Sequence, residues 1–239
     1  MLNLKLKTLN FYFSEKKDGR FPDSAGVKTF LEQQLGQATP SHLILENGGE
    51  LQLLTGDNLG QDFTADALVT NFSVGEKRPK KIRISMVVGD CFPLTIFDQK
   101  SGNVALIHAG WRPLYLGILD HVWQLMLEQW SSDSENLWAL LGPGIRAESY
   151  LMSDKPVQTD EPEWQNFVKK TNLNPDRPWQ IDLPAFIKHS LDKKGFNMAH
   201  FQDCQLDTFA NPDRFFSHRR RQLSGEEKGR MIAALELPI

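Results

Sequence analysis

Cysteine is scarce in this sequence: Cys91 and Cys204 are the only two among 239 residues. Two cysteines are too few for a disulfide framework, which excludes the small disulfide-stabilised folds. No run approaches the 18 or so consecutive apolar residues that a membrane-spanning helix needs. The first residues alternate apolar and polar side chains, unlike the continuous apolar stretch of a secretory signal. We therefore expect a cytoplasmic protein that has no membrane partner.

An excess of charge of either sign is also lacking. The 27 Lys and Arg residues nearly balance the 30 Asp and Glu residues, and the formal net charge is −3. Because proteins that bind nucleic acid usually show a clear basic excess, we expect no nucleic-acid partner. Hydrophobic residues make up 40% of the chain and charged residues 24%, a balance that excludes a disordered or collagen-like protein.

The apolar periodicity predicts strands and helices that do not alternate strictly along the chain. Strands are expected over 3–13, 82–88, 94–97, 104–107, 137–141 and 231–237, and residues 42–54 are expected to form a hairpin that turns at Gly48-Gly49. Helices are expected over 23–35, 117–130 and 183–194, and loops over 57–63, 153–162 and 171–178. This order favours an α+β fold with a mixed sheet, in one domain that covers residues 1–239.

Two strand ends carry residues capable of chemistry. The segment Gly89-Asp90-Cys91-Phe92-Pro93 follows one strand with an acid and a thiol, and the segment His108-Ala109-Gly110-Trp111-Arg112-Pro113 follows a later strand with an imidazole and a guanidinium. Cys91 and His108 are 17 residues apart, at strand ends expected to be neighbours. A thiol and an imidazole within reach of each other either bind a metal such as zinc or form a nucleophile and its base.

These two segments resemble the Ala-Asp-Cys-x-Pro and His-Ala-Gly-Trp-Arg-Gly motifs of the YfiH-like family, also called the laccase-domain or multicopper polyphenol oxidoreductase family. Three other parts of the sequence are similar to motifs of that family in the same order: Ala65 to Thr70, Leu141 to Ile145, and Phe215 to Arg220 with Gly229-Arg230-Met231. The resemblance covers residues 65–239. It implies a single α+β domain with a mixed sheet, a fold that also resembles the deamidase toxins of the cytotoxic necrotizing factor type.

The resemblance also implies a cofactor and a reaction. It implies a mononuclear metal site formed by Cys91, His108 and an earlier histidine, with zinc rather than copper as the metal. It implies an enzyme that phosphorolyses purine nucleosides or deaminates adenosine, so a purine nucleoside and phosphate are the expected substrates. Some bacterial relatives are linked instead to the editing of peptidoglycan precursors. The chain has six histidines and no His-x-His pair, which excludes the copper cluster of a true laccase.

The sequence departs from the family pattern at the third metal ligand. Alignment of the motifs places Asn47 where the family has that histidine, and two strong ligands bind zinc more weakly than three. His42 is an alternative ligand that would need a change of register. Asp90 is expected to tune one ligand through a hydrogen bond. The family's Arg-x-Gly-Gly-Val-Ser segment is also absent, and Pro113 replaces a family glycine.

The expected substrates suggest roles for basic and aromatic residues near the same motifs. Phosphorolysis needs cations that hold phosphate, and Arg112, Arg219 and Arg230 are the candidates. For Arg219, a position on a solvent-exposed basic edge fits the sequence as well as a role in phosphate binding. We expect Trp111 either to stack on a purine or to pack in the core, and His218 to line the pocket.

Two other functions stay open at this stage. Without a third metal ligand, Cys91 would act as a thiolate nucleophile and His108 as its base, with Asn47 orienting the imidazole, as in a thiol hydrolase or deamidase. Alternatively, a chain that keeps the fold without catalysis would bind a nucleoside or a protein partner. The sequence predicts neither the preferred nucleoside nor the oligomeric state.

Overall fold

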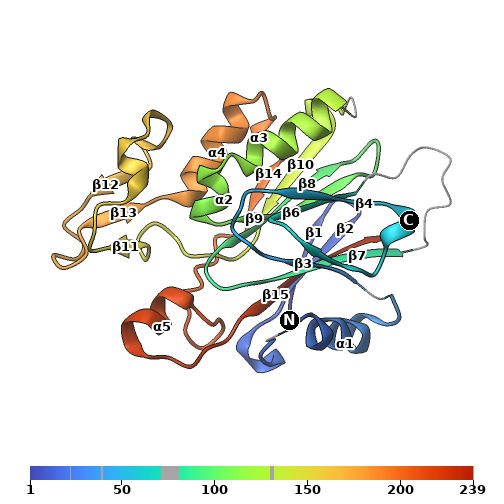
Figure 1. The fold of residues 1–239 in the computed structure, drawn as a ribbon, viewed down its shortest axis with the longest axis horizontal. Helices are drawn as coiled ribbons and strands as arrows, with labels where there is room; N and C mark the ends of the chain where they lie inside the picture. The colour runs from blue at the N-terminus through green and yellow to red at the C-terminus, as the bar shows by residue number, and fades with distance from the viewer. Residues whose placement is uncertain (22, 39, 71–80, 130–131, 239) are drawn as a thin grey trace.

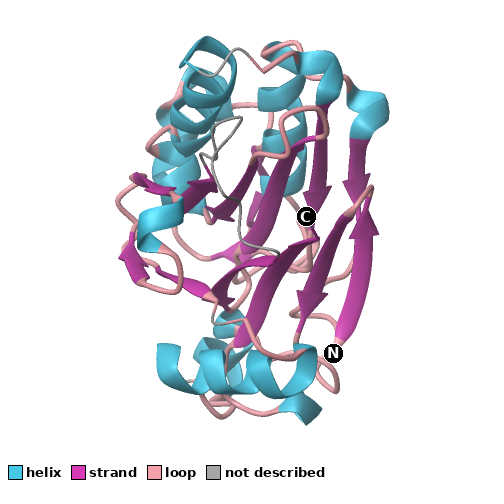
Figure 2. Ribbon diagram, turned by 90° about the vertical axis from the view of Figure 1, so that its right-hand side faces the viewer, coloured by secondary structure: helices cyan, strands magenta, loops and turns pink. Residues whose placement is uncertain are grey.

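The computed structural model describes residues 1–21, 23–38, 40–70, 81–129 and 132–238, and within them two large sheets stack between layers of helices (Figures 1 and 2). The first sheet has the order β1 (Leu2–Leu6), β2 (Leu9–Phe13), β15 (Met231–Pro238), β7 (Lys81–Val88), β3 (Ser41–Ile44), β5 (Asp62–Thr64). The second has the order β14 (Phe201–Asp203), β10 (Leu137–Leu141), β8 (Phe92–Asp98), β9 (Val104–Ala109), β6 (Ala67–Thr70), β4 (Leu51–Leu54). A small third sheet has the order β11 (Leu151–Met152), β13 (Trp179–Ile181), β12 (Val168–Lys170).

Both large sheets mix parallel and antiparallel neighbours. In the first sheet β7 pairs antiparallel with β15 and parallel with β3, and in the second sheet β6 pairs antiparallel with β9 and parallel with β4. The expected α+β fold with mixed sheets is therefore confirmed.

Alternation along the strands fills the space between the two sheets with apolar side chains. In β7, Ile84 and Met86 are fully buried in this inner core together with Leu106 of β9, which comes from the opposite sheet. Successive side chains of a strand point to opposite faces, so Arg83 and Ser85 of β7 face the outer side of the first sheet. The inner core thus fixes which residues of each strand can reach the space between the sheets.

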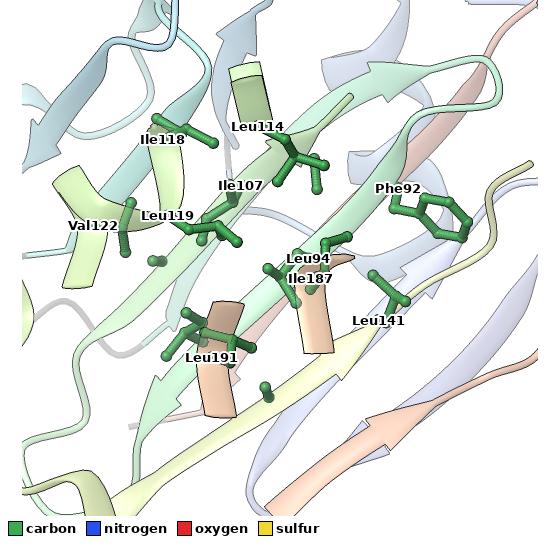
Figure 3. Packing of buried hydrophobic residues seen from close by; sticks show 14 of the residues in the cluster. Phe92, Leu94, Ile107, Leu114, Ile118, Leu119, Val122, Leu141, Ile187 and Leu191 are labelled. Carbon is green, nitrogen blue, oxygen red and sulfur yellow. The ribbon is translucent and has the colours of Figure 1, made fainter. Parts of the chain in front are cut away.

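Helices cover the outer face of each large sheet. Helix α1 (Ser24–Leu35) packs Val27 and Leu31 on the first sheet, beside Ile232 of β15. The second sheet is covered by α2 (Trp111–Tyr115), α3 (Ile118–Trp123) and α4 (Leu183–Lys193), as Figure 3 shows for side chains of these helices packed on β8, β9 and β10. Helix α5 (His218–Ser224) precedes β15 and lies apart from the three helices on the second sheet (Figure 1).

Most of the expected elements are confirmed. The expected strands 82–88, 94–97, 104–107, 137–141 and 231–237 lie in β7, β8, β9, β10 and β15. The first expected helix is α1, capped by the Asp23 side chain, which accepts a hydrogen bond from the Gly26 amide. The helix expected over 117–130 is α3, continued by a π-helical segment over Gln124–Gln129, and Trp130 lies outside the described residues.

Two strand predictions are wrong. The stretch 3–13 is not one strand but the hairpin β1–β2, because the chain turns at Lys7, whose φ of 56° is left-handed. The expected hairpin 42–54 does not form, because β3 pairs with strands of the first sheet and β4 with β6 of the second. The intervening loop therefore connects the two sheets instead of closing a hairpin turn.

Within the described residues, no helix is both long and apolar enough to span a membrane. The cytoplasmic location stays a prediction.

The Arg83 side chain is fully buried and stabilises the end of α1. Its guanidinium donates to the carbonyl oxygens of Leu35 and Gly36 (both 3.1 Å) and pairs with the Glu236 carboxylate at 2.6 Å. Arg83→Met leaves a buried carboxylate without its main partner, so we expect the free energy of unfolding to fall by about 3–5 kcal/mol. Urea unfolding measures this. Arg20→Met, which breaks an exposed pair with Glu227, should cost no more than about 1 kcal/mol, and equal losses would contradict the account.

Candidate functional site

Two loops cross between the large sheets at the same end of the molecule. Residues 45–50 connect β3 to β4, and residues 89–91 connect β7 to β8. Since β3 and β7 run parallel in the first sheet, both loops leave that sheet at the C-terminal ends of these two strands. They enclose a cavity of about 850 Å³, within the range of small-molecule sites.

The pairing of β8 with β9 brings Cys91 and His108 together in this cavity. Phe92 pairs with Ala109 in antiparallel register, so Cys91, which precedes Phe92, lies opposite Gly110, which follows Ala109. A Cβ atom at Gly110 would lie 2.9 Å from the Cys91 Sγ and 3.1 Å from the His108 Nε2, which shows that both atoms face the same point. The thiol and the imidazole are therefore neighbours in the cavity. The expected proximity of the two side chains is therefore confirmed.

Asp66 orients the imidazole of His108. Its Oδ1 lies 2.7 Å from the His108 Nδ1, and the two residues are cross-strand neighbours because Ala67 of β6 pairs with Ile107 of β9. Asp66 is fully buried and also accepts hydrogen bonds from the backbone amides of Asn47 (3.1 Å), Gly48 (2.7 Å) and Gly49 (3.0 Å). One carboxylate thus fixes both the ring and the crossing loop.

These contacts shift the pKa values of both partners. Burial raises the pKa of Asp66, but the hydrogen bonds from His108 and from the backbone amide of Gly49 outweigh it, and the pKa is lowered. Burial lowers the pKa of His108, but the neighbouring Cys91 and Asp66 outweigh it and raise the pKa to about 9. An ionised Asp66 requires Nδ1 to carry a proton, so Nε2 is the ring nitrogen available toward Cys91 and the cavity.

Asp90 has a different role from the expected one. Its carboxylate accepts hydrogen bonds from the Thr208 hydroxyl (2.7 Å), the Ser217 hydroxyl (2.9 Å) and the Arg219 amide (2.6 Å). It therefore anchors the C-terminal motif to the crossing loop, and the partner of the imidazole is Asp66. Asp66 lies in the motif Ala65 to Thr70, for which the sequence predicted no individual role. The register of β6 against β9 was the missing signal.

Asn47 lines the same cavity as Cys91 and His108, on a left-handed backbone with φ of 59°. Among the described residues, no three His, Cys, Asp or Glu side chains come close enough to hold a metal ion together. The Cys91 sulfur and the His108 imidazole thus supply two donors, and the third neighbour is a neutral amide. A catalytic zinc site takes three protein ligands, so the donor set does not fit zinc.

His42 does not replace the missing ligand. It also lines the cavity, but it is 2% exposed, its Nδ1 lies 3.0 Å from the Ser85 Oγ, and among the described residues it belongs to no group of three potential metal ligands. Burial, which outweighs the nearby Asp62, lowers the pKa of His42 to about 4. The alternative in which His42 completes a metal site is therefore wrong.

The lowered pKa of His42 predicts a contribution to acid sensitivity. A depressed folded-state pKa means that the unfolded chain takes up a proton first, so stability is lost as the pH falls from about 6.5 toward 4. Between pH 7 and about pH 4.5 this group should cost the protein about 2 kcal/mol. In His42→Gln, which has no titrating ring, the loss of unfolding free energy over that interval should be smaller by this amount. Equal losses in parent and variant would contradict the assignment.

Three basic residues also line the cavity: His218, Arg219 and Arg230, here called the basic wall. The His218 Nδ1 and the Arg219 Nε are buried without a hydrogen-bond partner, and the Arg230 guanidinium packs on Gly89. Burial and the nearby Arg230 lower the pKa of His218. The structure thus brings these three predicted binding residues to one wall.

Of the other predicted site residues, Trp111 lines the cavity and Arg112 lies on the surface outside it. Trp111 begins α2, is 38% exposed and lines the cavity, so the alternative that it packs in the core is wrong. Arg112 is exposed and is not among the residues that line the cavity. Tyr150, which the sequence analysis did not consider, lines the cavity, and burial followed by the nearby Cys91 raises its pKa.

Two stacked mixed sheets covered by helices define a class of α+β proteins that is also known from solved structures. YlmD from Geobacillus stearothermophilus superposes with a TM-score of 0.78 at 22% identity, over 98% of this chain and 93% of that one. YfiH from Bacillus licheniformis superposes with a TM-score of 0.75 at 18% identity, over 96% and 92%. These similarities establish the fold.

The family follows from the sequence. A family model described as multi-copper polyphenol oxidoreductase laccase matches residues 33–238, and the chain belongs to this family. It is 28% identical over 208 residues to a purine nucleoside phosphorylase of Xylella fastidiosa (strain Temecula1), covering 82% of this chain and 73% of that protein. It is 25% identical over 158 residues to the purine nucleoside phosphorylase YlmD of Bacillus subtilis, covering 64% and 54%. The family resemblance is thus confirmed.

Proposed function

We propose that this chain is a purine nucleoside phosphorylase that also deaminates adenosine. The proposal rests on one cavity that is lined both by the Cys91–His108 pair and by the three side chains of the basic wall. Phosphorolysis needs both an anion site for phosphate and a group that handles a proton at the leaving base. The names of the relatives support the same reaction class.

The basic wall is the proposed phosphate site. Phosphate carries about two negative charges near neutral pH and takes hydrogen bonds best from charged donors. Arg219 is held in place through its amide on Asp90 and its guanidinium on the Leu151 carbonyl, so its buried Nε is a preorganised donor. Arg230 and the Nδ1 side of His218 complete the set.

The nucleoside would lie between this wall and the thiol–imidazole pair. Trp111 offers an exposed ring on which a purine can stack, and Ile145 and Met152 supply apolar contacts in the same cavity. Stacking holds the base by its faces and leaves its ring nitrogens free to receive a proton.

The chemistry uses this chain's own residues, because the donor set does not fit zinc. A phosphate oxygen attacks C1′ of the ribose, the bond from C1′ to the purine breaks, and the leaving purine takes a proton from the His108 Nε2. The products are ribose 1-phosphate and the free base. Asp66 keeps the imidazole oriented throughout by holding Nδ1. In adenosine deamination, the oxygen of water would add at C6, one proton of that water would pass to N1 of the purine, and the other would pass through the His108 Nε2 to the leaving ammonia.

Kinetics with phosphate test this arrangement. Purified protein with inosine, guanosine or adenosine and phosphate should release free base, which chromatography detects. Arg230→Gln should raise the KM for phosphate at least about tenfold, since a charge-assisted hydrogen bond contributes about 1.5–3 kcal/mol, and should change the KM for the nucleoside little. Arg221→Gln, which removes a basic side chain of α5 outside the cavity lining, is the control. No free base from any nucleoside would overturn the proposal.

A further inference from the structure

We propose that the same cavity contains a second, metal-independent activity: acyl transfer from esters and amides to the Cys91 thiol. The proposal concerns four residues that the two crossing loops and their strands bring together, Asn47, Asp66, Cys91 and His108. It follows from the disagreement between these residues and a zinc site. It does not depend on nucleoside or phosphate binding.

The first three of the required groups are in place. The Cys91 thiol is half-buried and lines the cavity, and its Sγ faces the same point at Gly110 as the His108 Nε2, so the imidazole is placed to take its proton. His108 is 3% exposed and cannot turn freely, and Asp66 holds its far nitrogen at 2.7 Å. A thiol, a base within hydrogen-bond reach and a carboxylate that orients the base form the arrangement of a thiol nucleophile.

Asn47 supplies the fourth group. Its backbone amide donates to the Asp66 Oδ1, so the carboxylate that orients His108 also fixes the backbone of Asn47. Asn47 is exposed and lines the same cavity as the thiol, so its side-chain amide is available to a bound carbonyl group. An imidazole at this position would offer a metal a lone pair, whereas a carboxamide offers an N–H donor. Such a donor stabilises the negative oxygen that develops when a thiol attacks a carbonyl.

Gly110 keeps the nucleophile and base accessible to each other. A Cβ at this position would meet both the Sγ and the Nε2 at 3.1 Å or less. The backbone of Gly110 has φ of −86°, which any residue can adopt, so only the contact with the pair disfavours a side chain there. Gly110→Ala therefore perturbs the pair without straining the backbone.

The proposed step balances as follows. The Cys91 sulfur forms a bond to the acyl carbon, its proton passes to the His108 Nε2, and the bond from carbon to the alcohol or amine breaks. The leaving group takes the proton from Nε2, which leaves a thioester on Cys91. Water then attacks the thioester, releases the carboxylic acid and restores the thiol.

The test uses the full chain, excess EDTA and p-nitrophenyl acetate as the probe, without nucleoside or phosphate. We expect a burst of p-nitrophenolate close to one equivalent and an acetyl group on the peptide that contains Cys91, identified by mass spectrometry. Cys91→Ala should abolish the burst, and Asn47→Ala should slow acylation by about 100-fold, the usual cost of one oxyanion donor. Gly110→Ala should slow it as well. Cys204→Ala, which removes the other thiol, should leave it unchanged.

Three outcomes would overturn the proposal. The first is a burst that persists in Cys91→Ala. The second is an acylation rate that Asn47→Ala leaves unchanged, because Asn47 would then contribute no oxyanion donor. The third is a burst that EDTA abolishes and zinc restores, because the site would then depend on a metal. Since the probe needs neither phosphate nor nucleoside, failure of the burst is distinguishable from failure of phosphorolysis.

Discussion

Replacing Asn47 with histidine should raise the affinity of the protein for zinc at least about tenfold, a difference on the order of 1.4 kcal/mol. The variant would place an imidazole beside the Cys91 thiol and the His108 Nε2, in the cavity that all three residues line. Three protein ligands and one open position are the composition of a catalytic zinc site. Asp66 already fixes both the loop and one of the ligands, so little reorganisation should be needed.

Zinc titration with a competing chelator measures this change, and His42→Ala is the control. Because His42 is bonded to Ser85, its removal should leave the zinc affinity unchanged. The histidine variant should also show slower acylation by p-nitrophenyl acetate, since it loses the amide donor. If neither substitution alters zinc binding, Asn47 does not occupy the position of a ligand. If His42→Ala abolishes binding, the ligand set has been assigned to the wrong residue.

Asp66→Asn should lower the kcat/KM of nucleoside phosphorolysis by about 100-fold, at the upper end of the usual effect of losing a carboxylate partner of a functional histidine. The amide lacks the charge that holds the His108 Nδ1, and it can orient its own N–H toward the ring. The loop over Asn47–Gly49 also loses a charged acceptor for three amides. Both the kcat/KM of phosphorolysis and the free energy of unfolding should therefore fall.

Asp98→Asn separates these two effects. Asp98 is also a buried carboxylate, it accepts the Lys100 amide at 2.8 Å and the Ser132 hydroxyl at 2.7 Å, and it lies at the far end of β8 from Cys91. Its replacement should lower the free energy of unfolding and leave kcat/KM nearly unchanged. Equal loss of activity in both variants would show that Asp66 acts through stability alone.

The Asp66 variant should also change the pH dependence of stability. The pKa of His108 is raised in the folded protein, so its contribution is fully present below about pH 6.5 and is lost as the pH rises through about 9. In Asp66→Asn this alkaline loss of unfolding free energy should shrink, because one of the two groups that raise the pKa is removed. An unchanged slope would assign the whole shift to Cys91.

Local sequence patterns predicted the strands and helices of this fold better than they predicted which strands pair with each other. The alternation in β7 and the apolar stripe of α3 are properties of neighbouring residues, and both were predicted. The error at 42–54 arose because two glycines suit a hairpin turn and a crossing loop equally well. Only the pairing of β3 and β4 with different sheets, a contact between distant segments, separates the two.

In the candidate site, too, features set by neighbouring residues were predicted and contacts between distant segments were not. Cys91 and His108 were predicted together because a short hairpin joins their strands, and the hairpin register is local. Asp66 was missed because it is 42 residues from His108, and its role depends on how β6 pairs with β9. Asp90 was assigned to the wrong partner because its proximity to Cys91 in sequence concealed its bonds to residues 208–219.

In the function that we propose, one cavity binds both a purine nucleoside and an anion, with the anion at the basic wall. The most direct test is a crystal structure of the protein soaked with inosine and sulfate, an unreactive substitute for phosphate. The account predicts a purine against Trp111 and an anion within hydrogen-bond distance of at least two of His218, Arg219 and Arg230. An anion bound at Arg112, or a nucleoside in the separate groove lined by Tyr115 and Trp164, would contradict it.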